Sequence, residues 1–271
     1  MRIRAIYFSP TGTTRQITSA VARQLAKRLG CDLMETPYTL PRQRMEFPPI
    51  EDDQIVVWGS PVYAGRIPNK TLEFIEQAIV GKSNAAIAIA VYGNRSFGDA
   101  AAEMCGRLEA GGMHAVAAAA MVARHAFASA AGRGRPSEED YEELSRFVDS
   151  IPTERLCNPG SDLLKVDGRR EPESYYVPLR ADGEPAKFLK ARPEVDENLC
   201  IRCGRCVERC PMGSIEKENG LPVFKGICIK CQACVKSCQQ EAIAFADEDF
   251  LSHKEMLEKN YCTPKKNCFF V

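Results

Sequence analysis

The chain has 271 residues, of which 45% are hydrophobic and 27% are charged, and its formal net charge is zero. A neutral chain has no strongly basic character that would favour nucleic acid or an anionic membrane, so we expect neither as a partner. It contains no run of roughly 18 apolar residues, which argues against membrane insertion through a helix. The opening stretch, MRIRAIYFSP, is too short in apolar residues for a signal peptide, and we expect a cytoplasmic protein.

Residues 1–151 alternate between short apolar runs and longer amphipathic segments, which predicts strands that alternate with helices. Strands are expected at 3–8, around Leu33, and at 55–58, 85–91 and 115–122. Helical spacing of apolar residues covers 16–29, 70–79, 100–110 and 138–151. This order predicts an α/β domain with a doubly wound parallel sheet, and five strands suit the flavodoxin-like order.

The run Ser9-Pro10-Thr11-Gly12-Thr13-Thr14 follows the first expected strand and opens the first expected helix. Backbone N–H groups and small hydroxyl side chains in that position can surround a phosphate. The run has neither the lysine of a nucleoside-triphosphate loop nor a GxGxxG pattern, so a monophosphate is the better fit. The alternative is an ordinary helix cap.

Two further loops, 60–68 and 92–99, follow the next strands of the expected sheet. With the phosphate run, they make residues 1–150 resemble flavodoxin, a family that binds FMN. The resemblance implies that the phosphate is held by Ser9, Thr11, Gly12, Thr13 and Thr14. It implies that the ring is held by Ser60, Pro61, Val62, Tyr63, Gly65, Arg66, Tyr92, Gly93, Asn94, Arg95 and Phe97. Thr13 departs from the family, which usually has asparagine there.

Three of these side chains have specific expected roles. Tyr63 and Phe97 are candidates for stacking on the flavin, although each could simply pack its loop onto the sheet. Arg66, with Arg95 on the next loop, could stabilise the anionic reduced flavin, because a nearby cation favours a negative charge. The alternative for Arg66 is an ordinary surface arginine.

Residues 152–193 contain six prolines and predict a linker or a segment draped over the sheet domain. At the other end, residues 248–271 predict a terminal helix at 251–259 and a tail that holds Cys262 and Cys268.

Eight of the thirteen cysteines lie between Cys200 and Cys238, in two similar halves offset by 28 residues. Each half has three cysteines at intervals of three and a fourth four residues later. Structural zinc on paired CxxC units is the alternative, but it gives no reason for the third and fourth cysteines. Residues 194–247 therefore resemble the bacterial ferredoxin domain with two [4Fe–4S] clusters, a small α+β fold.

That resemblance implies that each half gives its fourth cysteine to the other cluster. One cluster would be held by Cys200, Cys203, Cys206 and Cys238, and the other by Cys228, Cys231, Cys234 and Cys210. Cys210 is followed by the usual proline, whereas Cys238 is followed by Gln239, which does not remove a ligand.

Together the two resemblances describe a fusion of a flavodoxin-like FMN domain with a two-cluster ferredoxin, a combination found in anaerobic bacteria and archaea. They imply an iron–sulfur flavoprotein that relays electrons between its clusters and FMN and exchanges them with redox partner proteins. The alternatives are a redox sensor and a flavin-dependent reductase of a small molecule, for which Arg95, His125 and Arg133 are the candidate polar groups. No catalytic residue is assigned, and the oligomeric state is open.

Overall fold

The computed structural model describes residues 1–160 and 162–271, and its largest unit is a six-stranded sheet. The strands span Arg2–Tyr7 (β1), Leu33–Pro37 (β2), Gln54–Pro61 (β3), Ala85–Tyr92 (β4), His114–Val122 (β5) and Cys268–Phe270 (β10). In space their order is β10-β5-β4-β3-β1-β2. The first five strands run parallel and have the 2-1-3-4-5 order of the flavodoxin-like fold, which confirms the predicted fold class. The antiparallel sixth strand, β10, was not predicted.

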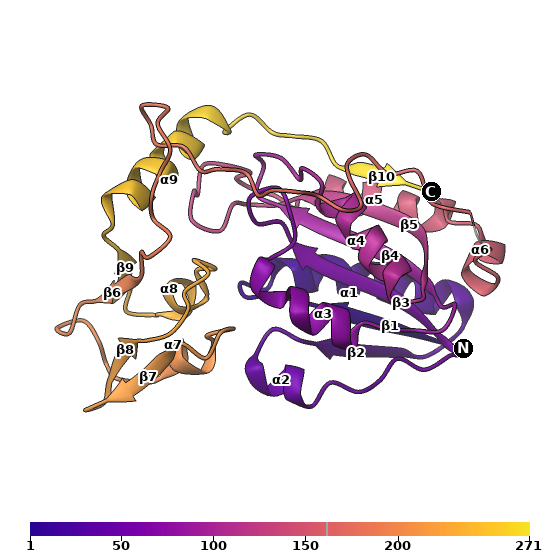
Figure 1. The fold of residues 1–271 in the computed structure, drawn as a ribbon, viewed down its shortest axis with the longest axis horizontal. Coiled ribbons are helices and arrows are strands. Elements are labelled where there is room, and N and C mark those ends of the chain that lie inside the picture. Colours follow the sequence, from indigo (N-terminus) through magenta and orange to yellow (C-terminus); the bar gives the residue numbers. More distant parts are fainter. Residues whose placement is uncertain (161) are drawn as a thin grey trace.

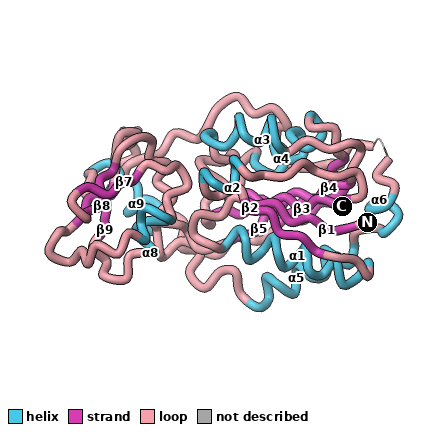
Figure 2. Tube along the Cα trace, turned by 90° about the horizontal axis from the view of Figure 1, so that it is seen from below, coloured by secondary structure: helices cyan, strands magenta, loops and turns pink. Residues whose placement is uncertain are grey.

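Helices cover both faces of this sheet, with α1 and α5 on one side and α3 and α4 on the other (Figure 2). They span Thr13–Leu29 (α1), Pro41–Met45 (α2), Leu72–Ala78 (α3), Ala100–Ala110 (α4), Glu138–Ser150 (α5) and Thr153–Cys157 (α6), with a 3₁₀ turn at Asn69–Thr71 (η1). Coverage on both faces explains the continuous apolar runs of β3, β4 and β5.

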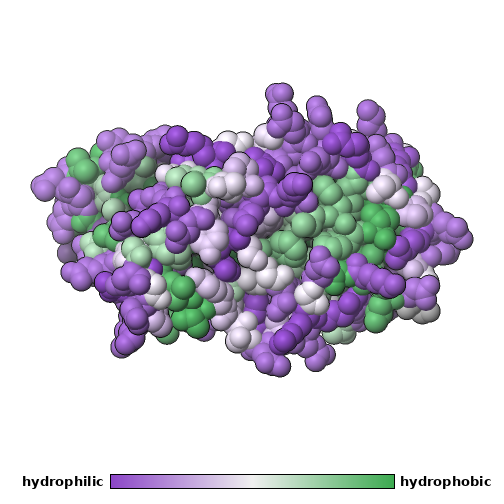
Figure 3. All heavy atoms as spheres, turned by 90° about the horizontal axis from the view of Figure 1, so that it is seen from above, coloured by the Kyte–Doolittle hydropathy of each residue, from purple (hydrophilic) through white to green (hydrophobic). Residues whose placement is uncertain are grey.

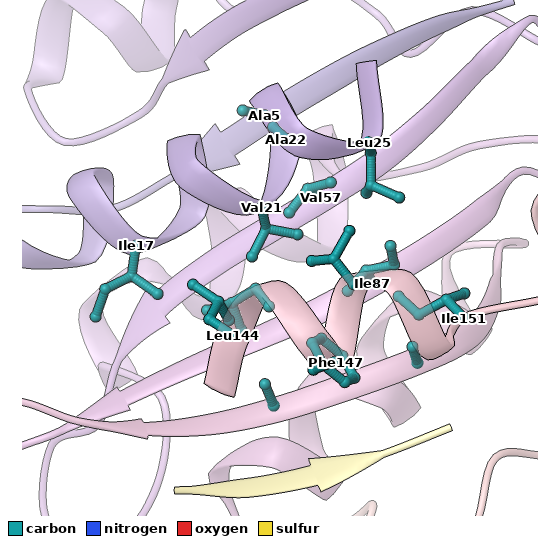
Figure 4. Close-up of a cluster of buried hydrophobic side chains, with 14 of the residues drawn as sticks. Ala5, Ile17, Val21, Ala22, Leu25, Val57, Ile87, Leu144, Phe147 and Ile151 are labelled. Atoms are coloured by element: carbon teal, nitrogen blue, oxygen red, sulfur yellow. The ribbon is translucent and has the colours of Figure 1, made fainter. Parts of the chain in front are cut away.

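The apolar residues that recur at helical spacing in α1 and α5 form a core against one face of the sheet. Ile17 and Val21 of α1 and Leu144 and Phe147 of α5 point toward Ile87 and its neighbours on the sheet (Figure 4). All five are buried. The opposite face has a second core, which includes Trp58.

Residues 162–192, as described, contain no helix or named strand and run along the sheet domain as a draped segment. The segment is tied to the loop after β3 at two points. Tyr176 N donates to Ala64 O at 2.9 Å, and Tyr175 Oη donates to Ile67 O at 2.9 Å.

The cysteine-rich region forms a small separate unit at the left of Figure 1. Its elements are Pro193–Val195 (β6), Arg205–Glu208 (α7), Ile215–Glu218 (β7), Leu221–Phe224 (β8), Ala233–Ser237 (α8) and Ile243–Phe245 (β9). β6 pairs with β9, and β7 pairs with β8, both antiparallel. Each half contributes one short helix that follows its first cysteines.

The chain then returns to the sheet. Helix α9 (Glu248–Asn260) follows the cysteine-rich region, and the tail crosses from it to β10 at the far edge of the sheet (Figure 1). Asn94, which is fully buried, fixes this tail: its Nδ2 donates to Tyr261 O and Thr263 O, and Lys265 N donates to its Oδ1.

The surface in Figure 3 is mostly hydrophilic, with apolar side chains gathered in several patches. Within residues 1–160 and 162–271, no helix is both long and apolar enough to cross a membrane.

Candidate cofactor sites

The cysteines of the block gather in two groups of four, each around its own cavity. The first cavity is lined by Cys200, Cys203, Cys206 and Cys238, which we call the distal group. The second is lined by Cys210, Cys228, Cys231 and Cys234, the proximal group. Each group thus takes three cysteines from one half and the fourth from the other, which is the grouping that the resemblance implies.

The two exchanged cysteines have matching surroundings. Ser214 N donates to Cys210 Sγ at 3.3 Å, and Ala242 N donates to Cys238 Sγ at the same distance. Such N–H···S bonds stabilise negative charge on the sulfur of a cluster ligand. The missing proline after Cys238 therefore leaves this part of the local geometry intact.

A third cavity, of about 250 Å³, lies at the carboxyl ends of the parallel strands, and we call it the central cavity. It is lined by residues of the loops after β1 and β3, the two neighbouring strands between which the strand order reverses. Doubly wound sheets bind their ligands at that point. Of the residues predicted to hold FMN, those that line it are Thr11, Thr13, Thr14, Pro61, Val62, Tyr63, Tyr92, Gly93 and Arg95.

The beginning of α1 suits a phosphate. Gly12, the N-cap residue, has a φ of 95° and no side chain to cap the helix, and no acidic residue occupies the first turn. Ser9 faces the helix rather than the cavity, because its Oγ accepts a hydrogen bond from Arg15 N. Thr13 and Thr14 open the helix and line the cavity, where the positive end of the helix dipole favours an anion.

Five predicted ring contacts do not line the cavity: Arg66, which is described below, and Ser60, Gly65, Asn94 and Phe97. Ser60 is fully buried, and Asn94 binds the C-terminal tail. Gly65 meets the next loop, where Asp99 N donates to its carbonyl oxygen. Phe97 packs edge-on against Tyr92 with ring centroids 5.6 Å apart, so the structure favours its packing role over flavin stacking.

The hypothesis that Arg66 acts on the flavin is not supported by its position. Its guanidinium is buried and pairs with the carboxylate of Glu103, with Nη2 and Oε1 2.6 Å apart. The ring of Tyr175 covers the guanidinium at 4.3 Å. Arg66 therefore fixes the loop after β3 to α4. The sequence alone could not show this, because Glu103 is 37 residues away.

Unlike Arg66, and together with Arg124 in the segment after β5, Arg95 does line the cavity. Its guanidinium stacks on Tyr176 at 3.8 Å, and burial lowers its pKa. Lys230 also lines the cavity, with its pKa lowered mainly by burial. No aspartate or glutamate is among the described residues of this lining, so the charged side chains that a reduced, anionic ring placed here would meet are cations, apart from the sulfur of Cys231.

His125, a polar candidate for the alternative reductase, also lines this cavity, whereas Arg133 is exposed outside it. The backbone N–H groups of Phe127 and Ala128 donate to His125 Nδ1. The neutral ring therefore carries its proton on Nε2. Burial lowers the His125 pKa to about 3, so the ring is a neutral hydrogen-bond donor at neutral pH.

Besides segment 123–127 after β5, the remaining lining comes mainly from three regions that the sequence did not connect with the flavin. Tyr176, Pro178 and Phe188 belong to the draped segment, and His253 and Leu257 belong to α9. The third region is the cysteine block itself, through Ile229, Lys230 and Cys231. The draped segment and α9 could have been recognised in the sequence by their aromatic and histidine side chains, because these segments have no core of their own.

The central cavity and the proximal group share a residue. Cys231 lines both, and Tyr63 lines the central cavity with it. Burial, and then the charges of Cys231 and Cys228, raise the pKa of Tyr63. The distal group shares no lining residue with the central cavity. A group in the central cavity would therefore have only the proximal cysteines as direct neighbours.

The residues present fit FMN. A helix N-terminus with small hydroxyl side chains suits its phosphate, and the apolar and aromatic walls suit a flat ring. Aromatic stacking is available from Tyr63.

Comparisons with known proteins support the cysteine region directly. The family described as 4Fe-4S binding domain matches residues 193–216. An uncharacterized ferredoxin of Methanocaldococcus jannaschii is 31% identical over 87 residues, which is 32% of this chain. The chain spans about half (52%) of the length of that relative. The chain therefore contains a 4Fe-4S binding domain.

Solved structures similar to the sheet domain include flavodoxins. One from Streptococcus pneumoniae TIGR4 is 20% identical, with a TM-score of 0.36, over 56% of this chain and 97% of that one. One from the domain Archaea is 15% identical, with a TM-score of 0.39, over 58% and 99%. TM-scores this low decide nothing by themselves. The flavodoxin-like fold follows from the observed strand order, beside which the chain carries its 4Fe-4S ferredoxin domain.

Proposed function

We propose that this chain is an electron-transfer protein that holds two [4Fe–4S] clusters and one FMN, with the clusters in series toward the flavin. The distal and proximal groups would each hold one cluster, and the central cavity would hold FMN. When bound, the clusters supply one-electron transfers and FMN supplies one- or two-electron storage. The observation that carries the proposal is the position of Cys231, which lines both the proximal cavity and the central cavity.

The series has an outer end. Cys203 of the distal group is exposed, as are the neighbouring side chains of Ile201, Arg202 and Arg205. Redox partner proteins would meet the chain there, and an acidic partner surface would match the two arginines. Electrons would then pass the proximal group before reaching the central cavity, or take the reverse course.

The test is an analysis of the full chain purified without oxygen. About eight irons, a matching amount of sulfide and one FMN per chain are expected. Zinc in place of iron, about four irons, or no flavin would each contradict a stated part of the proposal. Reduction with limiting amounts of a one-electron donor, followed by optical spectra, then shows whether clusters and flavin exchange electrons.

The second candidate is a reductase that acts on a small molecule at the flavin. It is favoured by Arg95 and His125, which supply polar groups to an otherwise largely apolar cavity. A turnover assay separates the two functions. Stoichiometric exchange with ferredoxin-type proteins, with no small molecule consumed, supports the carrier, whereas repeated turnover of a small molecule supports the reductase.

A further inference from the structure

A fourth cavity, of about 280 Å³, lies against segment 124–127 and is lined by that segment, α8, α9 and β9. Segment 124–127 also lines the central cavity, so it is a wall common to both. We propose that this adjacent cavity binds a small organic anion, a carboxylate with an apolar body. Gln232 and Phe245 also line the proximal cavity, but no residue of this lining is one of those predicted to hold FMN or a cluster.

The positive charge of the cavity comes from three separate elements. Arg124 follows β5, Lys236 is on α8, and Lys254 is on α9. No acidic residue lines the cavity within the described chain. Among the ion pairs and side-chain hydrogen bonds of the described residues, none involves the charged end of any of the three. The neighbouring carboxylate of Glu258 accepts hydrogen bonds from Ser129 N and Oγ. Cations gathered in this way attract an anion and can donate charge-assisted hydrogen bonds to it.

The apolar part of the ligand is indicated by Phe127 and Leu251 in the same lining, of which Leu251 is 44% exposed. Phe245 and Phe250 also belong to the lining but are almost fully buried. Phe245 stacks on Phe250 with ring centroids 4.3 Å apart, and Phe127 lies 4.8 Å from Phe250. A concave site with aromatic walls and a few convergent polar groups is the usual form of a small-molecule site. An inorganic anion would leave these walls unused, which is why we infer an organic one.

A competing explanation is that the cations balance the negative charge of the clusters. It fits Lys236, which lies between two cysteines of the block in sequence. It does not account for Arg124 and Lys254, which are brought to the cavity by the sheet domain and by α9. The two explanations predict different results when the cations are removed.

The test is isothermal titration calorimetry on the full, cofactor-loaded chain under anaerobic conditions. Benzoate is the probe, benzamide is its neutral counterpart, and inorganic phosphate is the third ligand. We expect saturable benzoate binding and much weaker binding of the other two. Arg124→Gln and Lys236→Gln should each weaken benzoate binding about tenfold or more, the scale of one lost charged hydrogen bond.

Lys259→Gln, at an exposed position near the end of α9, is the matched control and should leave the affinity unchanged. Arg124→Lys should restore part of the affinity. Iron and FMN contents confirm that each variant is folded. The proposal is overturned if benzoate does not bind, if benzamide or phosphate binds equally well, or if both glutamine variants change only the cluster potentials.

Discussion

The distal and proximal groups are close copies in sequence but have different surroundings. Both halves have the same cysteine spacing, and both exchanged cysteines accept a backbone N–H at 3.3 Å. Yet Cys203 of the distal group is exposed, whereas Cys231 of the proximal group lies against the central cavity. Burial raises the pKa of the Cys231 thiol to about 12.

The two halves of the repeat therefore offer the same set of cysteines, and the contact with the sheet domain is what makes their surroundings different. Two cysteine groups of equal spacing differ as an outer and an inner one because only one of them lies against the central cavity.

The largest effect is expected from removing one ligand of each group. Cys203→Ala and Cys231→Ala should each lower the iron content from about eight to about four per chain. With reduced ferredoxin as donor, flavin reduction should slow in Cys203→Ala and stop in Cys231→Ala, because only the latter loses the cluster beside the central cavity. Stopped-flow absorbance of the flavin measures both rates.

Each variant must retain FMN and the signal of its other cluster, which electron paramagnetic resonance can record. Equal slowing in the two variants would mean that the groups are equivalent in function and that the inner and outer distinction is wrong.

The next effect concerns the loop that carries Tyr63 between the central cavity and the proximal group. Arg66→Ala should lower the free energy of unfolding by about 3–5 kcal/mol, because the buried carboxylate of Glu103 loses its partner. Chemical denaturation measures this change. Flavin and cluster potentials in the folded variant should match the wild type, and a shifted flavin potential would instead revive a direct role for Arg66.

A smaller, selective effect is expected on the flavin side of the comparison. Arg95→Gln removes a cation from the central cavity and should lower the two-electron flavin potential by roughly 30 mV, or about 1.4 kcal/mol. Both cluster potentials should stay unchanged in a spectroelectrochemical titration. Arg133→Gln, at an exposed position outside the cavity, serves as the matched control.

The smallest effect is expected at His125, which should add no pH dependence to the flavin potential. Its pKa is lowered to about 3 by burial, so the ring gains no charge as the pH falls from about 8 to 6. The difference in flavin potential between wild type and His125→Asn should therefore be constant over that range. A wild-type potential that rises relative to the variant toward low pH would show that His125 becomes protonated.

Much of the arrangement could be predicted from local patterns. The alternation of apolar runs predicted five parallel strands, and the resemblance carried by the cysteine spacing implied which four cysteines lie together. The loops after β1, β3 and β4 were found because the carboxyl ends of parallel strands meet at one edge.

What could not be predicted depends on contacts between distant segments. The draped segment has no periodicity, so nothing indicated that Tyr176 and Phe188 would line the cavity. β10 is a three-residue strand whose pairing with β5 depends on a tail held by Asn94. Arg66 was misread because its partner belongs to another element.

The return of the tail to β10 has a consequence for the covalent integrity of the molecule. The chain passes from the sheet domain to the cysteine-rich unit through residues 162–192 and comes back through α9 and the tail. A single protease cut in the exposed turn at Ala181–Glu184 therefore leaves the two units joined by a continuous peptide. A second cut, in α9 or the tail, would be needed before the proximal group could separate from the central cavity.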